Sequence, residues 1–244
     1  MRKSRLRRQE GLFAAEGKKM FLEAPDSWIE KVYISESLMK TDLEAAEKAK
    51  RFDCCLVADR AFEQMSDTCT PQGVLVLLHT PDWRAEDFLK PGGIYVILEN
   101  LQDPGNLGTI FRTGEGAGIN GLILAGSCVD PTSPKAVRST MGSAYRVPYV
   151  QTGSAAEAAE LLAGCGIRIY AAHLGGQREY DEPDYRTGAA FLIGNEGNGL
   201  TPEGARAAHE LIRIPMGGRV ESLNAAMAAG ILMYEASRQR RRSA

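Results

Sequence analysis

Three features are missing from this sequence: a paired cysteine motif, a long apolar run and an excess of positive charge. Five cysteines include the adjacent pair Cys54 and Cys55, but none has the C-x-x-C spacing or a nearby histidine, which argues against a zinc site or a disulfide framework. Reduced, buried thiols are therefore expected. The apolar stretches are too short to span a membrane, and the N-terminus lacks the apolar segment of a signal peptide. These absences predict a cytoplasmic protein with no membrane partner and no metal.

The net charge of −2 gives no general attraction to nucleic acid, yet the charge is unevenly spread. Residues 1–19 have a net charge of +5, and residues 238–242 add four arginines. Such clusters can bind phosphates locally. Terminal basic residues can equally be solvated, and arginine at a helix C-terminus also complements the helix dipole, so charge alone leaves both explanations open. The basic residues of the first cluster are Arg2, Lys3, Arg5, Arg7, Arg8, Lys18 and Lys19.

Strand and helix patterns alternate along the 244 residues, which predicts an α/β fold in one large or two modest domains. After the Pro- and Gly-rich stretch 79–93, the predicted strands become almost continuously apolar, as in a parallel sheet covered on both faces. The strands are predicted at residues 31–35, 54–58, 74–79, 94–98, 122–124, 168–172, 190–193 and 211–214. The first two helices are predicted at residues 16–23 and 42–52.

Residues 116–121 match the pattern G-x-G-x-x-G, which is found in dinucleotide-binding proteins. That fingerprint must follow a strand and open a helix. Here the glycines close a predicted helix and open a strand, so a helix stop explains them better. The sequence therefore argues against a nicotinamide- or flavin-dependent dehydrogenase.

The first candidate site lies at residues 100–112. Asn106 is expected to cap a helix whose apolar face includes Leu107, Ile110 and Phe111. Arg112 lies off that face, beside small residues that leave room for a ligand. A capped helix with a solvated arginine is the alternative for this segment taken alone.

Two further segments have the form of a strand followed by a polar, glycine-rich loop and a helix. In the first, Ile193 leads into a loop with Gly194 and Glu196, and Thr201 and Pro202 are expected to start the next helix. In the second, a strand ending near Ile214 leads through a polar loop into an almost uncharged helix over residues 224–238. Ligands of open α/β sheets bind beyond the carboxyl ends of the strands, so both loops are expected to border one site.

These motifs resemble those of the SpoU/TrmH family of RNA ribose methyltransferases, the SPOUT class. The resemblance covers residues 94–235 through Asn-x-Gly-x-x-x-Arg, Gly-x-Glu-Gly-x-Gly-Leu, and Ile-Pro-Met with Ser-Leu-Asn, and residues 133–144 resemble the segment between the first two motifs. Asn195 departs from the small residue more usual before the glutamate. Residues 12–78 resemble the family's ribosomal-protein-like substrate-binding domain more weakly. The predicted organisation is a substrate-binding domain at 1–80, a linker at 81–92 and a methyltransferase domain at 93–244.

The resemblance implies a parallel-sheet domain with a deep trefoil knot, bound S-adenosyl-L-methionine, methyl transfer to a ribose 2′-hydroxyl and a homodimer. The RNA is expected to be large-subunit ribosomal RNA. By position, the cofactor would contact Ile193, Gly194, Ile214, Met216 and Leu223. The catalytic group would comprise Asn106, Arg112, Glu196, Ser222 and Asn224.

Proton removal from the hydroxyl is the chemical problem in this reaction, since the motifs contain no histidine. The family assigns base character to the arginine at Arg112. Holding a guanidinium neutral at pH 7 costs roughly 9 kcal/mol, which favours Arg112 acting with an RNA phosphate to stabilise developing charge. The sequence leaves two alternatives open. The protein could methylate transfer RNA, or it could be a non-catalytic RNA-binding assembly factor of the same fold.

Overall fold

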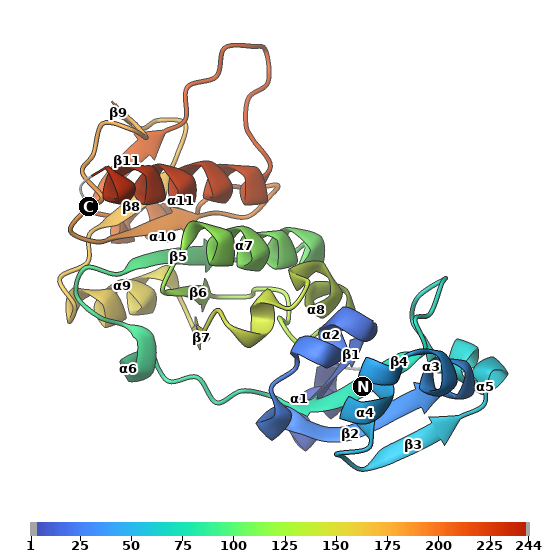
Figure 1. Cartoon of the computed structure of the whole chain (residues 1–244). Coiled ribbons are helices and arrows are strands. Elements are labelled where there is room, and N and C mark those ends of the chain that lie inside the picture. Colours follow the sequence, from blue (N-terminus) through green and yellow to red (C-terminus); the bar gives the residue numbers. More distant parts are fainter. Residues whose placement is uncertain (1–3, 243–244) are drawn as a thin grey trace. The chain divides into compact units, whose positions relative to one another are not determined.

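The structure, a computed structural model, describes residues 4–242 and divides into two compact units (Figure 1). The first unit comprises the chain up to Asp82 together with Asp130–Tyr145. The second comprises Trp83–Val129 and the chain from Arg146 onward. Residues 130–145 therefore pack with the first unit, although the sequence analysis places them in the methyltransferase domain.

A four-stranded sheet in the order β1-β4-β2-β3 forms the centre of the first unit. Strand β4 runs antiparallel to β1 and β2, and β3 runs parallel to β2. Alternate side chains, such as Phe13, Val32 and Val76, are buried in one core with Phe21 and Ala45 of the covering helices. The elements are α1 (Ser4–Glu10), β1 (Leu12–Glu16), α2 (Lys18–Glu23), the 3-10 helix η1 (Asp26–Trp28), β2 (Ile29–Ser35), α3 (Glu36–Thr41), α4 (Leu43–Ala49), β3 (Cys54–Val57), α5 (Asp59–Met65), β4 (Val74–His79), α8 (Pro134–Thr140) and the 3-10 helix η2 (Ser143–Tyr145).

The three strands predicted in this unit are confirmed, but β1 was missed. Glu16 was expected to begin a helix and instead ends β1, because Leu12–Glu16 alternates in burial and pairs along its whole length with β4. Helix α2 begins only at Lys18, after Gly17 in a positive-φ conformation. The expectation of buried thiols is also wrong, since Cys55 and Cys69 are exposed and the other three cysteines are only half-buried.

The second unit contains a seven-stranded sheet in the order β7-β6-β5-β10-β8-β11-β9. Every pair of neighbouring strands is parallel, as the apolar strand pattern predicts. Figure 1 shows α7 and α11 on one face and α9 on the other. The elements are α6 (Ala85–Phe88), β5 (Ile94–Glu99), α7 (Pro104–Ala117), β6 (Gly121–Ala125), β7 (Tyr149–Thr152), α9 (Ala155–Ala163), β8 (Ile169–Ala172), β9 (Arg178–Glu179), β10 (Ala189–Ile193), α10 (Pro202–Ala207), β11 (Glu210–Arg213) and α11 (Ala225–Arg241).

The five strands predicted in this unit are confirmed, whereas β7 and β9 at the two edges of the sheet were missed. The glycines at 116–121 behave as expected: α7 ends at Ala117, Gly118 is left-handed with φ 77°, and β6 follows. The predicted linker is not a plain connection, because it contains α6, whose Phe88 packs into the core of the second unit. None of the helices formed by residues 4–242 has the length and apolarity needed to cross a bilayer.

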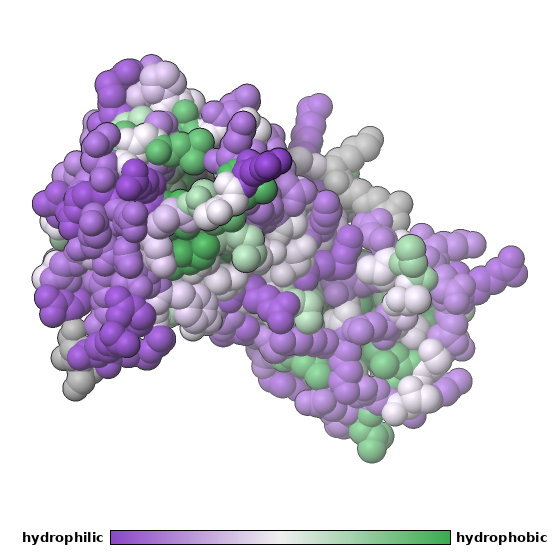
Figure 2. Space-filling model, turned by 90° about the horizontal axis from the view of Figure 1, so that it is seen from above, coloured by the Kyte–Doolittle hydropathy of each residue, from purple (hydrophilic) through white to green (hydrophobic). Residues whose placement is uncertain are grey.

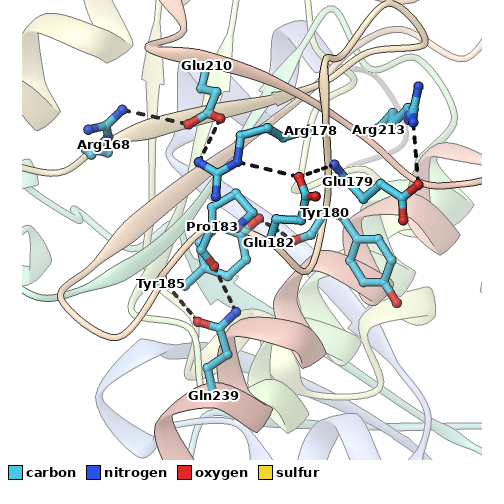
Figure 3. A network of polar contacts seen from close by, with 10 residues as sticks. All are labelled: Arg168, Arg178, Glu179, Tyr180, Glu182, Pro183, Tyr185, Glu210, Arg213 and Gln239. Atoms are coloured by element: carbon cyan, nitrogen blue, oxygen red, sulfur yellow. Dashed lines mark hydrogen bonds and ion pairs between the residues drawn. The ribbon is translucent and has the colours of Figure 1, made fainter.

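A polar network closes the β9 edge of the sheet (Figure 3). Arg178 of β9 lies 3.1 Å from Glu210 of β11. Gln239 of α11 accepts from the backbone N–H of Tyr185 at 2.9 Å and donates to the carbonyl of Pro183 at 3.0 Å. This network ties the irregular segment around β9 to the last helix, and a short, charged edge of this kind disfavours pairing with further strands.

Candidate functional site

Helix α7 begins at a different residue from the one predicted. Its N-cap is Asp103, whose Oδ1 accepts from the backbone N–H of Asn106 at 2.8 Å, and Pro104 occupies the first helical position. The expectation that Asn106 caps this helix is therefore wrong. Asn106 lies within the first turn, and its side-chain amide is left to bond elsewhere.

The amide of Asn106 joins two other predicted site residues. Its Nδ2 donates to Glu196 Oε1 at 3.0 Å, and its Oδ1 accepts from Asn224 Nδ2 at 2.9 Å. Asn224 also caps α11, since its Oδ1 accepts from the backbone N–H of Ala226 at 2.9 Å and of Met227 at 3.3 Å. One residue from each of the three motifs thus enters a single hydrogen-bonded chain.

Glu196 is the anionic member of this chain. Besides Asn106, it accepts from the backbone N–H of Asp103 at 2.9 Å and of Gln102 at 3.1 Å. Partial burial by itself raises the pKa of Glu196, but the hydrogen bonds from Asn106, Asp103 and Gln102 outweigh that effect and lower the pKa. Glu196 is therefore an ionised anchor near neutral pH, which clamps its loop onto the start of α7.

The glycine-rich loop has its own internal fastening. Asn195 and Gly199 exchange two backbone hydrogen bonds of 2.9 Å. The side chain of Asn195 accepts from the backbone N–H of Gly197 and Asn198, and its Nδ2 donates to the carbonyl of Asn100 at 2.8 Å. A Cβ at Gly194 would lie 2.3 Å from the carbonyl carbon of Gly199, so only glycine fits there. Asn195, the departure from the family pattern, has a clear structural role in this chain.

The loops border a cavity of about 410 Å³ at the carboxyl ends of β8, β10 and β11. All five predicted cofactor residues line it, as do Glu196 and Ser222. Its wall is largely apolar, with Leu200 and Ala228 added to the predicted residues, and polar residues such as Asn195, Glu196 and Ser222 line it as well. This combination suits a ligand with a flat apolar part and polar ends. The predicted cofactor residues in this cavity are Ile193, Gly194, Ile214, Met216 and Leu223.

Arg112 is the predicted site residue that neither joins the hydrogen-bonded chain of Asn106, Glu196 and Asn224 nor lines the cavity. It is exposed on α7, and it neither lines the cavity nor forms a hydrogen bond or ion pair within residues 4–242. Its apolar neighbours behave as predicted, since Leu107, Ile110 and Phe111 are buried. An exposed guanidinium on a rigid helix is available to a ligand that arrives from solvent.

Sequence reasoning missed two parts of the site. His173 and Leu174 follow β8 and line the cavity, and the rule that ligands bind beyond strand ends applies to β8 as well. Glu99, at the end of β5, is 5% exposed and accepts from Thr201 through the backbone N–H at 2.8 Å and the hydroxyl at 2.8 Å. A charged residue that ends an otherwise apolar strand was the available signal. Thr201 and Pro202 cap and start α10 as predicted.

The basic N-terminal cluster is less available than its charge suggests. Arg7 is buried and pairs with Asp130 at 2.5 Å, and Lys18 pairs with Asp42 at 2.6 Å. Lys19 lies 3.6 Å from Glu23. Arg2 and Lys3 lie outside the described residues. Charge counting therefore overestimates the number of cations that this cluster offers to RNA.

A parallel sheet with helices on both faces, whose glycine loops and polar residues converge on a cavity beyond the strand ends, defines an α/β enzyme domain that binds a small cofactor. Within residues 4–242 no cluster of His, Cys, Asp or Glu is arranged to hold a metal ion. The chain belongs to the SpoU rRNA Methylase family, which matches residues 93–234. An MRM3-like substrate binding domain matches residues 1–76.

Named relatives extend over nearly the whole chain. The 23S rRNA (guanosine(2553)-2′-O)-methyltransferase RlmP of Bacillus subtilis is 30% identical over 231 residues, which is 93% of this chain and 89% of that protein. The AdoMet-bound rRNA methyltransferase from Sinorhizobium meliloti has a TM-score of 0.87 at 33% identity, covering 97% of this chain and 90% of that one. The SpoU methyltransferase AviRb from Streptomyces viridochromogenes, in complex with AdoMet, has a TM-score of 0.88 at 27% identity over 98% of this chain and 94% of that one. The family predicted from the motifs is thereby confirmed.

Proposed function

We propose that this protein uses S-adenosyl-L-methionine to methylate a ribose 2′-hydroxyl in large-subunit ribosomal RNA. The observation that carries the proposal is the hydrogen-bonded chain of Asn106, Glu196 and Asn224 beside the strand-end cavity. The named relatives support the same chemistry, since RlmP is a 23S rRNA 2′-O-methyltransferase and two similar structures contain AdoMet. Transfer RNA remains the alternative substrate.

The cavity fits the cofactor by the nature of its lining. Ile193, Ile214 and Leu223 line it as apolar walls that suit an adenine ring, and Gly194 and Met216 line it beside them. When bound, S-adenosyl-L-methionine supplies an electrophilic methyl group. The loop that bears Glu196 is fastened before any ligand arrives, so little ordering remains to be done on binding.

The remaining predicted residues would act on the RNA. Arg112, exposed on α7, would bind a phosphate near the target ribose and stabilise negative charge that develops on the 2′-oxygen. Ser222, at the cavity, would hold the ribose hydroxyl in line with the methyl group, because in-line displacement depends on orientation. Asn106 and Asn224 would keep the three motif loops in register.

We also propose that the protein is a homodimer that pairs through the α11 side of the second unit. Met227 and Tyr234 of α11 are 59% and 48% exposed, and Val220 in the preceding loop is 62% exposed. Figure 2, which looks down on that side, shows apolar side chains gathered among hydrophilic ones. Exposed apolar groups of this kind favour a protein interface.

The deep trefoil knot belongs to the same proposal. After β11, near one edge of the sheet, the chain forms the loop that precedes Asn224. It then returns as α11, which packs on the central strands β5 and β10. This return path is compatible with threading of the chain through a loop. A cytoplasmic location stays a prediction.

The decisive experiment is transfer of a labelled methyl group to total RNA from a strain that lacks the gene, followed by nucleoside analysis of separated RNA fractions. We expect a 2′-O-methylated nucleoside in large-subunit ribosomal RNA and cofactor binding by calorimetry. Label in transfer RNA would select the alternative substrate. Methylation of a base, or absence of cofactor binding, would overturn the proposal, and RNA binding without transfer would indicate an assembly factor.

A further inference from the structure

The four-stranded sheet of the first unit has one covered face and one open face. Strand pairing places Ala14 beside Leu77, and Tyr33 beside Leu75, on the open face. All four side chains are only half-buried, whereas their sequence neighbours on the other face are buried beneath the helices. Open faces of antiparallel sheets usually carry polar residues, so an apolar open face with a tyrosine needs another explanation.

This face is the floor of a cavity of about 360 Å³. One wall comes from the end of α5 and the loop after it, with Met65 and Asp67. The other comes from α8, with Pro134 and Arg138. Glu16, at the end of β1, fixes the first wall by accepting from the backbone N–H of Asp67 at 3.1 Å and the hydroxyl of Thr68 at 2.6 Å. The cavity is therefore shaped before any ligand arrives.

The charges around the cavity restrict what it can bind. The guanidinium of Arg138 is half-buried and forms no hydrogen bond or ion pair within residues 4–242. Two carboxylates, Glu16 and Asp67, share the rim and disfavour an isolated phosphate. A flat group fits both parts of the cavity: its apolar face can pack on the floor, and its edge can donate hydrogen bonds to the carboxylates and accept them from Arg138. Unpaired nucleobases have this chemistry, and proteins recognise them by stacking and by hydrogen bonds to their edges.

We propose that this cavity binds an unpaired nucleobase of the RNA substrate, stacked near Tyr33 with Arg138 at its edge. The proposal rests on the proposed function for the existence of an RNA substrate, but it assigns a separate site on the first unit. It also gives a role to residues 133–144, which the methyltransferase motifs leave unexplained. RNA with a single-stranded loop or bulge is therefore the expected target.

The test measures binding of labelled single-stranded oligo(U) and oligo(A) RNA to the full chain, with a blunt RNA duplex and inorganic phosphate as comparison ligands. Tyr33→Ala should weaken single-strand binding roughly 5- to 150-fold, the range for loss of one stacked base, whereas Tyr33→Phe should keep it. Arg138→Ala should weaken it as well. Arg60→Ala, which removes an exposed arginine from α5 outside the cavity, is the matched control and should bind like the unaltered chain.

The proposal is overturned if the unaltered chain does not bind the oligonucleotides, if Tyr33→Ala and Arg138→Ala bind them normally, or if the duplex binds equally well. Inorganic phosphate that competes at the same concentration as RNA would also overturn it, because the site would then be an anion site. Cofactor affinity and methyl transfer are measured on the same samples. If only the nucleobase proposal is wrong, the unaltered chain still binds cofactor and still transfers the methyl group. If the proposed function is wrong, the unaltered chain does neither.

Discussion

Glu99 is expected to control cofactor binding without touching the cofactor. Its buried carboxylate accepts the backbone N–H and the hydroxyl of Thr201, and Thr201 ends the glycine-rich loop that borders the cavity. A Cβ at Gly204, one turn into α10, would lie 2.5 Å from Glu99 Oε1, so the helix is seated closely on this carboxylate. Replacing Glu99 should therefore loosen the glycine-rich loop at its C-terminal end, where Thr201 is held.

The size of the effect follows from the two hydrogen bonds. A hydrogen bond to an ionised group contributes about 1.5–3 kcal/mol, and Glu99 is only 5% exposed, so solvent screening is small. In Glu99→Gln the remaining side-chain oxygen still accepts one hydrogen bond from Thr201, but the new NH2 group faces the other donor of Thr201. In Glu99→Ala both acceptors are lost. If the whole loss appears in binding, the cofactor dissociation constant rises about 10-fold in Glu99→Gln and about 100-fold in Glu99→Ala. These values take the low end of that range, about 1.5 kcal/mol for each hydrogen bond, because Asn195 continues to fasten the loop.

The assay is calorimetric titration of S-adenosyl-L-methionine into the full chain, with thermal melting of the same samples. Glu203→Gln is the matched control, since Glu203 and its partner Arg206 on α10 are about 70% exposed and face solvent. The control should bind cofactor like the unaltered chain. If both Glu99 variants keep normal cofactor affinity while their melting temperature falls, Glu99 stabilises the fold and does not position the loop.

Four further outcomes are expected. Arg112→Ala should abolish methyl transfer and leave calorimetric cofactor affinity nearly intact; an equal loss of both would show that its assigned role is wrong. Because the folded-state pKa of Glu196 is lowered, its stabilising effect is complete above the ordinary pKa near 4.5 and is lost as the pH falls through the lowered value, so the melting-temperature gap to Glu196→Gln should shrink in acid. A gap that stays constant from pH 7 to pH 3 would contradict this. Asn224→Ala should cost about 1 kcal/mol of unfolding free energy through loss of the α11 cap, measured by denaturant titration; no change would remove the cap argument. Met227→Glu should convert the proposed dimer to monomer in light scattering, and a monomeric unaltered chain at micromolar concentration would rule the dimer out.

Much of the second unit could be predicted because its signals are local. The strand from Ile94 to Glu99 is fully buried. A short apolar run between turn signals predicts a buried strand, because helices are usually longer. The five residues assigned to the cofactor by the family resemblance line one cavity, because strand-end loops of a parallel sheet meet at one edge. The edge strand Arg178–Glu179 could not be found this way, since two polar residues carry no strand pattern and pair only because β11 lies beside them.

The errors come mainly from interactions between distant residues. One error is local: Asn106 has the right residue type for an N-cap, but Asp103, followed by proline, is the N-cap. The partners of the Asn106 side chain are Glu196 and Asn224, which lie 90 and 118 positions away. Arg7 counted as a surface cation until Asp130, 123 residues later, proved to neutralise it in a buried pair. A single sequence contains no distance information of this range.

The placement of residues 130–145 leads to a last prediction about the isolated second domain. The contacts that hold this segment in the first unit include the pair of Arg7 with Asp130, the hydroxyl of Tyr145 donating to the carbonyl of Met20 at 3.1 Å, and the edge-on packing of Tyr145 against Trp28 at 5.9 Å. Deleting residues 1–82 removes every one of those partners, keeps α6 with the second unit, and uncovers a tyrosine side chain whose burial contributes roughly 1.5–3 kcal/mol. The cavity, by contrast, is lined only by residues of the second unit. The fragment 83–244 should therefore bind cofactor as the full chain does, while its amides at 130–145 exchange hydrogen much faster. Full protection of that segment in the fragment would show that it belongs with the methyltransferase domain, as its sequence suggests.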